Sequence, residues 1–585
     1  GSMFLPLSLA VGFAMIASFI LSQTLVPVFS YWLLKDRDVN NTITSRFDRF
    51  KDRYSRWLRG LDKRSVVFIP LYLIAAFGLL WVLFAQLGTD ILPKTDTGQT
   101  QVRLRLPAGT RVERTETATQ QLLHLSDSIS GNHVEMSSAF IGVQPSSYPV
   151  NLIHLWTSGP QESVIKIKLQ KGYHASIETF KEKLRAAVGQ TISGAILSFE
   201  PGDMVEQVVN LGSTNPIEIA VMGKNLSQSG KVAAELNNKL KAISYLRDVQ
   251  IATPLNYPAV KMNIDRIKAG QSGLTVEQVT RSTVAATSSS RFTQPNYWLD
   301  KSSGTAYQVQ VEYPQYLVNS SDALGLIPVN AGTNTPVYLR DVATMQKTFM
   351  PGEYDRINQQ RFITITANIF QKDAGTAIHE VQKTIASLGV LPQGIKITLR
   401  GQADLLDQTV SELSTGLMIA IVVIFLMLTV NFQSFRLSLI VLSIIPAVIA
   451  GSFLLLWVTG QSLNIQSYMG TIMAVGVAVA NAILLLTSGE RYRRQDSHAD
   501  FAVTGATERL RPILMTSLAM IAGMIPMAIG FGEGGDQTAP LGIAVIGGLV
   551  LSTVSTLVFL PAIYRRIVGS KAYINPSLHP EDTGQ

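Results

Sequence analysis

Long uncharged stretches of apolar residues alternate with charged segments along this chain. A helix needs about 20 mostly apolar residues to cross a bilayer, and seven stretches qualify. They run approximately over Phe4–Leu34, Val66–Leu87, Leu413–Val430, Leu437–Val458, Ser467–Ser488, Ile513–Phe531 and Leu541–Tyr564. None carries Lys, Arg, Asp or Glu in its middle. So many uncharged stretches in series exclude the buried helices of a water-soluble core, and the pattern predicts a polytopic membrane protein.

Basic residues mark every second connection between these stretches. The segment Lys35–Arg64 holds ten Lys and Arg, and further Arg residues follow the third, fifth and seventh stretches. The connections at Thr459–Gln466 and Gly532–Pro540 carry none. Because basic short loops stay in the cytoplasm, seven crossings place the long insert from Gly88 to about Glu412 on the opposite side of the membrane.

The first basic connection also has helical periodicity. Its aromatic residues recur at intervals of three and four, and arginines stand beside them. These residues are Phe47, Phe50, Tyr54 and Trp57 with Arg46, Arg49, Arg53 and Arg56. This spacing predicts an amphipathic helix on the inner leaflet. Nucleic-acid binding is the weaker alternative, because the loop is tethered to the membrane at both ends.

The long insert alternates predicted strands and helices in two similar arrangements. The first has strands at Gln101–Leu106, Val134–Phe140, Val164–Leu169 and Ala195–Phe199, with helices after Thr110 and near Ile177–Val188. Thr110 and Glu113 are spaced as a capping box. The second has strands at Ile217–Val221, Val249–Thr253, Phe362–Ile369 and Ile395–Leu399, with helices near Gln228–Ile243 and Thr376–Leu388.

Residues 259–349 interrupt the second copy and include a capped helix at Thr275–Ala286 and a strand at Tyr307–Glu312. The insert is therefore predicted as two split β-α-β modules, one with an inserted subdomain.

Composition narrows the chemistry. The chain has no cysteine, a formal net charge of +8 and 15% charged residues. Without cysteine it has no thiolate metal site and no disulfide. Neither a Gly-x-Ser-x-Gly motif nor a phosphate-binding Gly-x-x-x-x-Gly-Lys-Ser/Thr element occurs. We therefore expect neither an enzyme nor an ATP-driven transporter. No pair of its seven histidines has helix-face spacing for a metal. Methionines in the insert keep a soft-metal exporter as an alternative.

Several segments, in this order, closely resemble one family. They are LGTDILPKTDTG (87–98) leading into LPAGT (106–110), VGVAVANAIL (475–484), RLRPILMTS (509–517), and GEGGD (532–536) before APLG (539–542) and VIGG (545–548). The chain resembles the resistance–nodulation–division superfamily in its hydrophobe/amphiphile efflux branch. The resemblance implies a C-terminal half that begins at the sixth of twelve spans. The Gly-Ser start is expected to be a cut or a cloning scar, and a signal peptide is not expected.

The resemblance divides the chain into segments. The fold class is a membrane α-helical bundle of seven spans with a periplasmic α+β domain of two ferredoxin-like modules and a docking subdomain. The expected segments are the sixth span (1–34), a cytoplasmic basic loop (35–65), a span (66–87), the first porter module (88–212), the second porter module (213–258 and 350–405), the docking subdomain (259–349), five spans (406–566) and a cytoplasmic tail (567–585).

The resemblance also implies a proton relay in the membrane. In the family, Asp residues of the fourth span take up protons beside a Lys of the tenth. At the position of that Lys this chain has Ala480, next to Asn481. Arg509 and Thr516 match family residues near the relay. Without the cation, nothing at Ala480 balances the carboxylates. The alternative to a role in the relay is that Thr516 bonds the backbone of its own helix and that Arg509 reaches the inner membrane surface.

A Gly-, Pro- and Ser-rich loop at Gly142–Pro160 corresponds to a family loop between substrate pockets. Phe140, Tyr148 and Trp156 are candidates to line a substrate path, although ordinary core or loop packing is the favoured account. The resemblance further implies a homotrimer in the bacterial inner membrane, with a periplasmic adaptor, an outer-membrane channel and hydrophobic substrates as partners. Proton-driven export is the main hypothesis, and a non-transporting assembly or sensing protein is the alternative that Ala480 keeps open.

Overall fold

The computed structural model describes most of the chain. The described residues are 5–34, 46–62, 65–93, 97–143, 157–170, 173, 176–202, 206–207, 210, 212–330, 335–495, 500–531 and 534–569. They form two compact units, which are considered separately. One unit comprises residues 1–72, 481–514 and 556–585. The other comprises residues 73–480 and 515–555.

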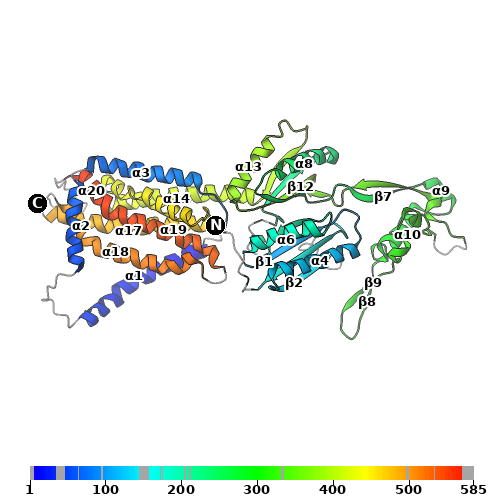
Figure 1. Ribbon diagram of the computed structural model, residues 1–585, viewed down its shortest axis with the longest axis horizontal. Coiled ribbons are helices and arrows are strands. Elements are labelled where there is room, and N and C mark those ends of the chain that lie inside the picture. Colours follow the sequence, from blue (N-terminus) through cyan, green and yellow to red (C-terminus); the bar gives the residue numbers. More distant parts are fainter. Residues whose placement is uncertain are drawn as a thin grey trace. The chain divides into compact units, whose positions relative to one another are not determined.

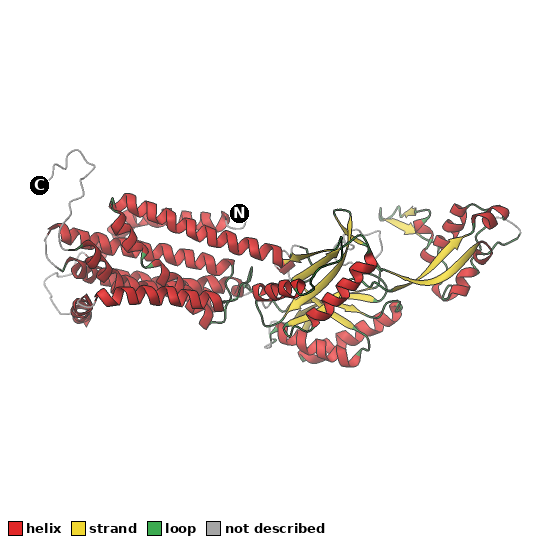
Figure 2. Ribbon diagram, turned by 90° about the horizontal axis from the view of Figure 1, so that it is seen from above, coloured by secondary structure: helices red, strands yellow, loops and turns green. Residues whose placement is uncertain are grey.

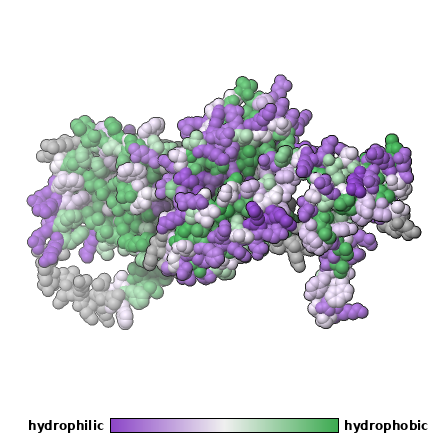
Figure 3. All heavy atoms as spheres, turned by 45° about the vertical axis from the view of Figure 1, so that its right-hand side comes forward, coloured by the Kyte–Doolittle hydropathy of each residue, from purple (hydrophilic) through white to green (hydrophobic). Residues whose placement is uncertain are grey.

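Long apolar helices occupy both ends of the chain (Figure 1). Among the described residues, seven helical segments are long and apolar enough to cross a membrane. The helices are α1 (Leu5–Leu34), α3 (Ser65–Gln86), α14 (Gln402–Phe432), α15 (Phe435–Leu442) with α16 (Ile445–Val458), α17 (Ile465–Gln495), α18 (Phe501–Ile529), and α19 (Gly535–Val554) with α20 (Leu560–Val568). Apolar side chains gather over this helical part, whereas the sheet-bearing part has a largely polar surface (Figure 3).

Several of these helices differ from the predicted stretches at their ends. Helix α14 begins at Gln402 and not near Leu413, and α17 continues through Arg493 to Gln495. Charged residues can extend a helix beyond its apolar part, so hydropathy alone places the ends too far inward. The fourth stretch is broken between α15 and α16, where Pro446 stands in the first turn. The last is interrupted by η3 (Ser555–Phe559), a π-helix.

Small residues allow close contact between α16 and α19. A side chain at Gly451 or Gly547 would collide with the backbone of the other helix. Ser452 Oγ donates a hydrogen bond of 2.8 Å to the carbonyl of Ala544. This close approach, with a hydroxyl bonded across the helices, is typical of helix packing in membranes.

The first sheet has the strand order β2-β3-β1-β4, with its neighbouring strands antiparallel. Its strands are β1 (Gln99–Arg105), β2 (Val134–Ile141), β3 (Glu162–Leu169) and β4 (Ile196–Glu200). Helices α4 (Val112–Ser130) and α6 (Ile177–Thr191) pack against it (Figure 2). Leu104, Leu122, Phe180 and Leu184 are fully buried between the layers and form its core.

The second sheet repeats this arrangement. Its order is β11-β12-β5-β13, with β6 also paired to β12. The strands are β5 (Ile217–Met222), β6 (Leu246–Ile251), β11 (Asp355–Ile357), β12 (Gln360–Ile369) and β13 (Lys396–Gly401). Helices α8 (Leu226–Lys241) and α13 (Ala374–Ala386) share a core with it. Strand β13 leads directly into α14 at Gln402.

The interrupting subdomain stands on a two-stranded ribbon. Strands β7 (Tyr257–Ile264) and β10 (Ala343–Met350) pair over their full length. Between them lie α9 (Arg266–Gln271), α10 (Val276–Ser288), α11 (Ser321–Gly325) and α12 (Leu339–Val342), with a hairpin of β8 (Asn296–Leu299) and β9 (Ala306–Val309). The capped helix is confirmed, because Thr275 and Gln278 form a capping box at the start of α10.

One local prediction for the insert is wrong, and two predicted strands are present with shifted ends. Thr110 and Glu113 form no capping box. Helix α4 starts after Arg111, and Thr110 Oγ1 donates to the carbonyl of Pro107 instead. The strand expected at Val249–Thr253 is β6, shifted toward Leu246, and Thr253 bonds the carboxylate of Glu353. The strand expected at Tyr307–Glu312 ends at Val309, because its partner β8 has only four residues.

Candidate functional site

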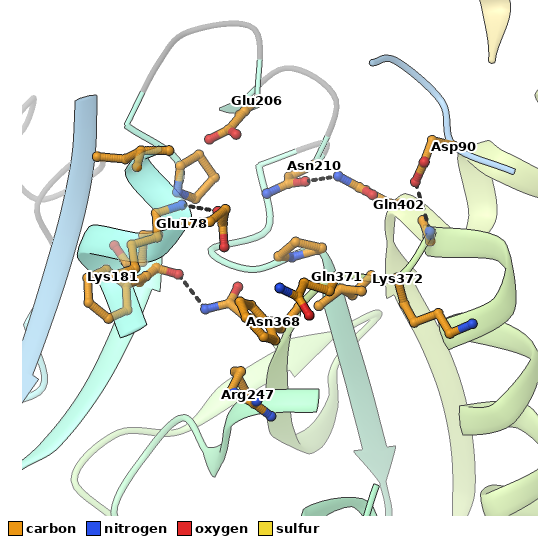
Figure 4. A pocket seen from close by; sticks show the side chains of 18 of the residues that line it. Asp90, Glu178, Lys181, Glu206, Asn210, Arg247, Asn368, Gln371, Lys372 and Gln402 are labelled. Atoms are coloured by element: carbon orange, nitrogen blue, oxygen red, sulfur yellow. Dashed lines mark hydrogen bonds and ion pairs between the residues drawn. The ribbon is translucent and has the colours of Figure 1, made fainter. Parts of the chain in front are cut away.

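A cavity lies between the two modules and beside the segment that follows α3. Its volume is about 420 Å³. Helix α6 contributes Glu178, Lys181, Glu182 and Arg185, and the second module contributes Arg247, Asn368 and the residues before α13. Figure 4 shows Glu178 and Lys181 on one side of the cavity, with Gln402, Asp90 and Lys372 on the other. Polar side chains from several elements therefore converge on one space.

A polar seam between the modules forms one wall of this cavity. Its centre is Asp248, whose side chain is 2% exposed. Its carboxylate accepts hydrogen bonds from Arg185 Nε at 2.7 Å and Nη2 at 3.0 Å, from Asn368 Nδ2 at 2.7 Å and from the Phe199 amide at 3.1 Å. Asp248 adopts φ +53°, a conformation that Asp tolerates better than most residues. Four donors on one buried carboxylate tie β6, α6, β4 and β12 together.

A second ion network strengthens the same seam. Glu162, which is 1% exposed, binds Arg105 and Arg103, while Glu200 binds Arg103. Arg105 also donates to the carbonyl of Ile251 at 3.0 Å, at the end of β6. Burial alone would raise the pKa of Glu162, but Arg105, Arg103 and the Ser158 amide reverse that effect and hold the pKa below its ordinary value. The carboxylate of Glu162 therefore remains ionised within the seam.

The segment after α3 forms the opposite side. The amide of Asp90 donates to the carbonyl of Leu463 at 2.9 Å, and the amide of Leu463 donates to the carbonyl of Gly88 at 2.8 Å. The same segment caps helix α13. Asp90 accepts from the Ala374 amide at 2.8 Å, and Asp373 accepts from the amides of Thr89 and Thr376. Residues 88–91 thus connect the end of α3, the loop before α17 and the start of α13 in one hydrogen-bonded joint.

The charges that line the cavity are mixed, with an excess of carboxylates. They are Asp90, Glu178, Glu182, Glu200, Glu206 and Asp536 against Lys181, Arg185, Arg247 and Lys372. Glu178 and Glu182 are engaged by Lys181 and Arg185 on the same helix. Within the described ranges, no three His, Cys, Asp or Glu residues group closely enough to hold a metal ion. The cavity can therefore attract a hydrated cation electrostatically without chelating it.

Sequence reasoning missed most of this cavity. Asp90 lies inside the segment 87–98 that carried the family resemblance, but its role in the joint depends on residues far along the chain. The glutamates of α6 lie on a helix that was predicted correctly. Their spacing gives no indication that one face meets a second module.

The residues predicted for the proton relay lie on two helices. Helix α17 carries Ala480, which is exposed, and Asn481, which is 7% exposed. Helix α18 carries Arg509 and Thr516. Arg509 is half-buried, and its Nε has no hydrogen-bond partner within the described part of the chain. Thr516 is exposed. Their role in a relay stays a prediction.

Of the three residues predicted for a substrate path, Phe140 is the one that the structure describes, and it does not line the cavity. Phe140 lies in β2, where it is half-buried and opposite Val164 of β3. Tyr148 and Trp156 lie outside the described residues. The cavity wall comes instead from α6, β4 and the end of β12.

Two similar α+β modules between apolar helices are the architecture expected of the resistance–nodulation–division superfamily. The AcrB/AcrD/AcrF family pattern matches residues 1–568. The chain belongs to this family.

Curated relatives are similar over nearly the whole chain. The cation efflux system protein CzcA of Alcaligenes sp. is 28% identical over 97% of this chain and 53% of its own length. The nickel and cobalt resistance protein CnrA of Cupriavidus metallidurans is 27% identical over 96% of this chain and 52% of its own length. The crystal structure of a heavy metal efflux pump has the same fold. Its TM-score is 0.80 at 24% identity, over 96% of this chain and 56% of that one.

These matches correct two predictions. The chain spans about half the length of the curated relatives it matches. The matches do not support the predicted assignment of the chain to the C-terminal half. The relatives are named for cation efflux and metal resistance, so the predicted hydrophobe/amphiphile branch is not supported. The segments used for that prediction follow α3 and β1 or lie largely inside α17, α18 and α19. Such segments reflect the architecture of the superfamily and not the cargo.

Proposed function

We propose that this chain is part of an inner-membrane efflux permease whose cargo is a divalent metal cation. The observation that carries the proposal is that relatives similar over 96% or more of the chain are named as cation, cobalt-zinc-cadmium, nickel-cobalt or nickel-cobalt-cadmium proteins. Hydrophobic or amphiphilic cargo, the main expectation from the sequence, has no comparable support. The two modules and their cavity then lie on the periplasmic side.

The cavity between the modules suits transit of a cation more than storage. A transport path must bind its ion weakly enough to release it. An excess of carboxylates raises the local concentration of cations, while the lack of a chelating group in the described residues keeps binding weak. The seam around Asp248 keeps this wall rigid.

The rest of the pump is proposed on the same basis. The complete protein assembles as a trimer, engages a periplasmic adaptor and an outer-membrane channel, and uses a proton gradient. Asn481, Thr516 and Arg509 are proposed as residues near its relay. Ala480 stands where the family has a relay cation. The charge of the relay carboxylates is therefore balanced elsewhere in the complete protein.

Metal content of cells tests this proposal. The complete protein is expressed in a metal-sensitive bacterium that lacks its own exporters, and cell-associated zinc, cobalt, nickel and cadmium are measured by mass spectrometry. At least one metal is expected to fall relative to an empty vector. Unchanged content of all four metals, together with faster loss of a hydrophobic dye, would return the cargo to the hydrophobic class.

A paired substitution tests the cavity itself. Glu178→Gln with Glu206→Gln is expected to reduce export several-fold, because both carboxylates line the cavity. The matched control is Glu235→Gln with Glu277→Gln, which removes two exposed carboxylates elsewhere. Equal export by both pairs would remove the cavity from the path.

A further inference from the structure

Helix α2 (Arg46–Asp62) is fixed by two buried side chains. Tyr54 is 9% exposed and Leu58 is 2% exposed. Tyr54 Oη donates a hydrogen bond of 2.5 Å to the carbonyl of Leu557, which lies in the π-helix η3. Burial raises the pKa of Tyr54 well above its ordinary value, so its hydroxyl remains a donor. The helix therefore cannot rotate freely, and each flank has a defined direction.

The two flanks of α2 differ in chemistry. At about 100° per residue, Phe50 and Trp57 stand beside the docked face, at 51% and 50% exposure. Continuing round the same side come four exposed arginines: Arg46, Arg53, Arg49 and Arg56. Asp48 and Asp52 fall on the opposite flank with Arg59. The exposed aromatics thus stand beside arginines and away from the acids of the helix, although Asp52 neighbours Arg49 and Arg56 at the far edge of the row.

One arginine on this flank bonds its own helix, because Arg56 Nε donates a hydrogen bond of 3.5 Å to the carbonyl of Asp52. Arg59 of the other flank pairs with Asp500 at 3.1 Å. Arg46, Arg49, Arg53 and Arg56 make no ion pair with any residue that the structure describes. Six cationic residues on one exposed helix would ordinarily be distributed around it, so a one-sided row of four indicates an external anion.

The position of α2 in the chain selects that anion. Only residues 63–64 separate its last residue from α3, a candidate membrane span. The last turn of α2 is therefore close in the chain to the end of one span, and Tyr54 holds the middle of the helix against another at Leu557, which places α2 near the depth of lipid headgroups. Trp and Phe are favoured at that depth, and guanidinium groups bind phosphate through paired hydrogen bonds.

We propose that the flank formed by Phe50, Trp57, Arg46, Arg49, Arg53 and Arg56 binds the phosphate groups of anionic phospholipids in the cytoplasmic leaflet. The aromatic side chains enter the interface beside the acyl chains, and the arginines hold headgroups above them. Because Tyr54 ties α2 to η3, bound lipid also stabilises the end of the last apolar helix. This binding does not depend on which cargo the complete pump exports.

Lipid retention by the detergent-solubilised chain tests the proposal. Native mass spectrometry is used to titrate the chain with phosphatidylglycerol, with phosphatidylcholine and with inorganic phosphate. The double variant Arg49→Gln/Arg53→Gln is expected to bind phosphatidylglycerol on the order of 10- to 30-fold more weakly than the parent, from roughly fivefold per arginine near an anionic surface. The control Arg281→Gln/Arg340→Gln removes two exposed charges from the inserted subdomain and is expected to bind like the parent.

Further arms make the result decisive. The variant Arg49→Lys/Arg53→Lys keeps both charges and is expected to bind with intermediate strength, which separates a binding defect from misfolding. Phosphatidylcholine and free phosphate are expected to bind much more weakly than phosphatidylglycerol. Equal retention of phosphatidylglycerol by the parent and the double variant would overturn the proposal, and so would equal binding of phosphatidylcholine.

Discussion

Asp355 shows how a residue of the second module depends on neighbours that are distant in the chain. It lies in β11, half-buried, and its pKa is raised to about 6. Burial is the largest cause, the carboxylates of Glu353 and Glu218 add to it, and Arg400 opposes it. Arg400 is itself bonded to Glu218 at 2.8 Å. The ionised form of Asp355 is therefore less favourable in the folded protein than in the unfolded chain.

The raised pKa predicts a pH-dependent effect on stability. In the unfolded chain Asp355 ionises with a pKa of about 4. Its ionisation therefore destabilises the fold above about pH 6, and this cost fades as the pH falls toward 4. Asp355→Asn is expected to raise the thermal unfolding midpoint at pH 7.5 and to change it little at pH 4.5. The midpoint is measured for parent and variant at both values. A gain of the same size at both would contradict this assignment.

Little of this residue-level detail follows from the sequence. Tyr54 and Trp57 were placed correctly on one amphipathic helix, because helical periodicity is a local property. That Tyr54 is buried while Trp57 is exposed depends on Leu557, about five hundred residues away. The sequence around Asp248 did not indicate its role, because its partners come from three other elements.

The joint at residues 88–91 is the element through which α3, the loop before α17 and α13 meet. Two glycines make it possible. A side chain at Gly88 would overlap the carboxylate of Asp373, and one at Gly375 would overlap the hydroxyl of Thr89. Displacement of either partner breaks a hydrogen bond that caps α13. The joint therefore holds the second module to two of the apolar helices.

Substitution in this joint is expected to weaken it. Gly375→Ala should lower the stability of the chain by about 1–3 kcal/mol, because it forces apart a packed contact. The control is Gly189→Ala in α6, where an added side chain meets nothing within 4 Å and helix propensity favours Ala by up to about 1 kcal/mol. Thermal unfolding of both variants is measured in detergent. A Gly375→Ala protein as stable as the control variant would show that the joint tolerates displacement.

The elements themselves were predicted best where their pattern is local and strong. The apolar helices and most strands of the two modules were expected near their observed positions. Strands β7, β8 and β10 were not expected. β7 and β10 pair with each other across the whole inserted subdomain, and β8 is a short exposed strand. Pairing between such distant segments leaves no periodic signal that identifies the partner.

For the whole molecule, the superfamily was predicted correctly and the branch was not. The architecture follows from long apolar helices and two repeated modules, which the sequence displays directly. The cargo depends on a few side chains in a cavity assembled from four or more elements. Short segment motifs therefore identified the superfamily, and only the names of the relatives redirected the proposed cargo to metal cations.

The central claim is that the apolar helices cross the membrane and leave the two modules on the side opposite α2. The chain has no cysteine, so single cysteines can be introduced and labelled with a membrane-impermeant maleimide. The variant Lys301→Cys, between β8 and β9, should label in cells whose outer membrane has been permeabilised. The variant Arg491→Cys, near the end of α17, should label only after lysis. Labelling of Arg491→Cys in intact spheroplasts, or protection of Lys301→Cys, would contradict the account.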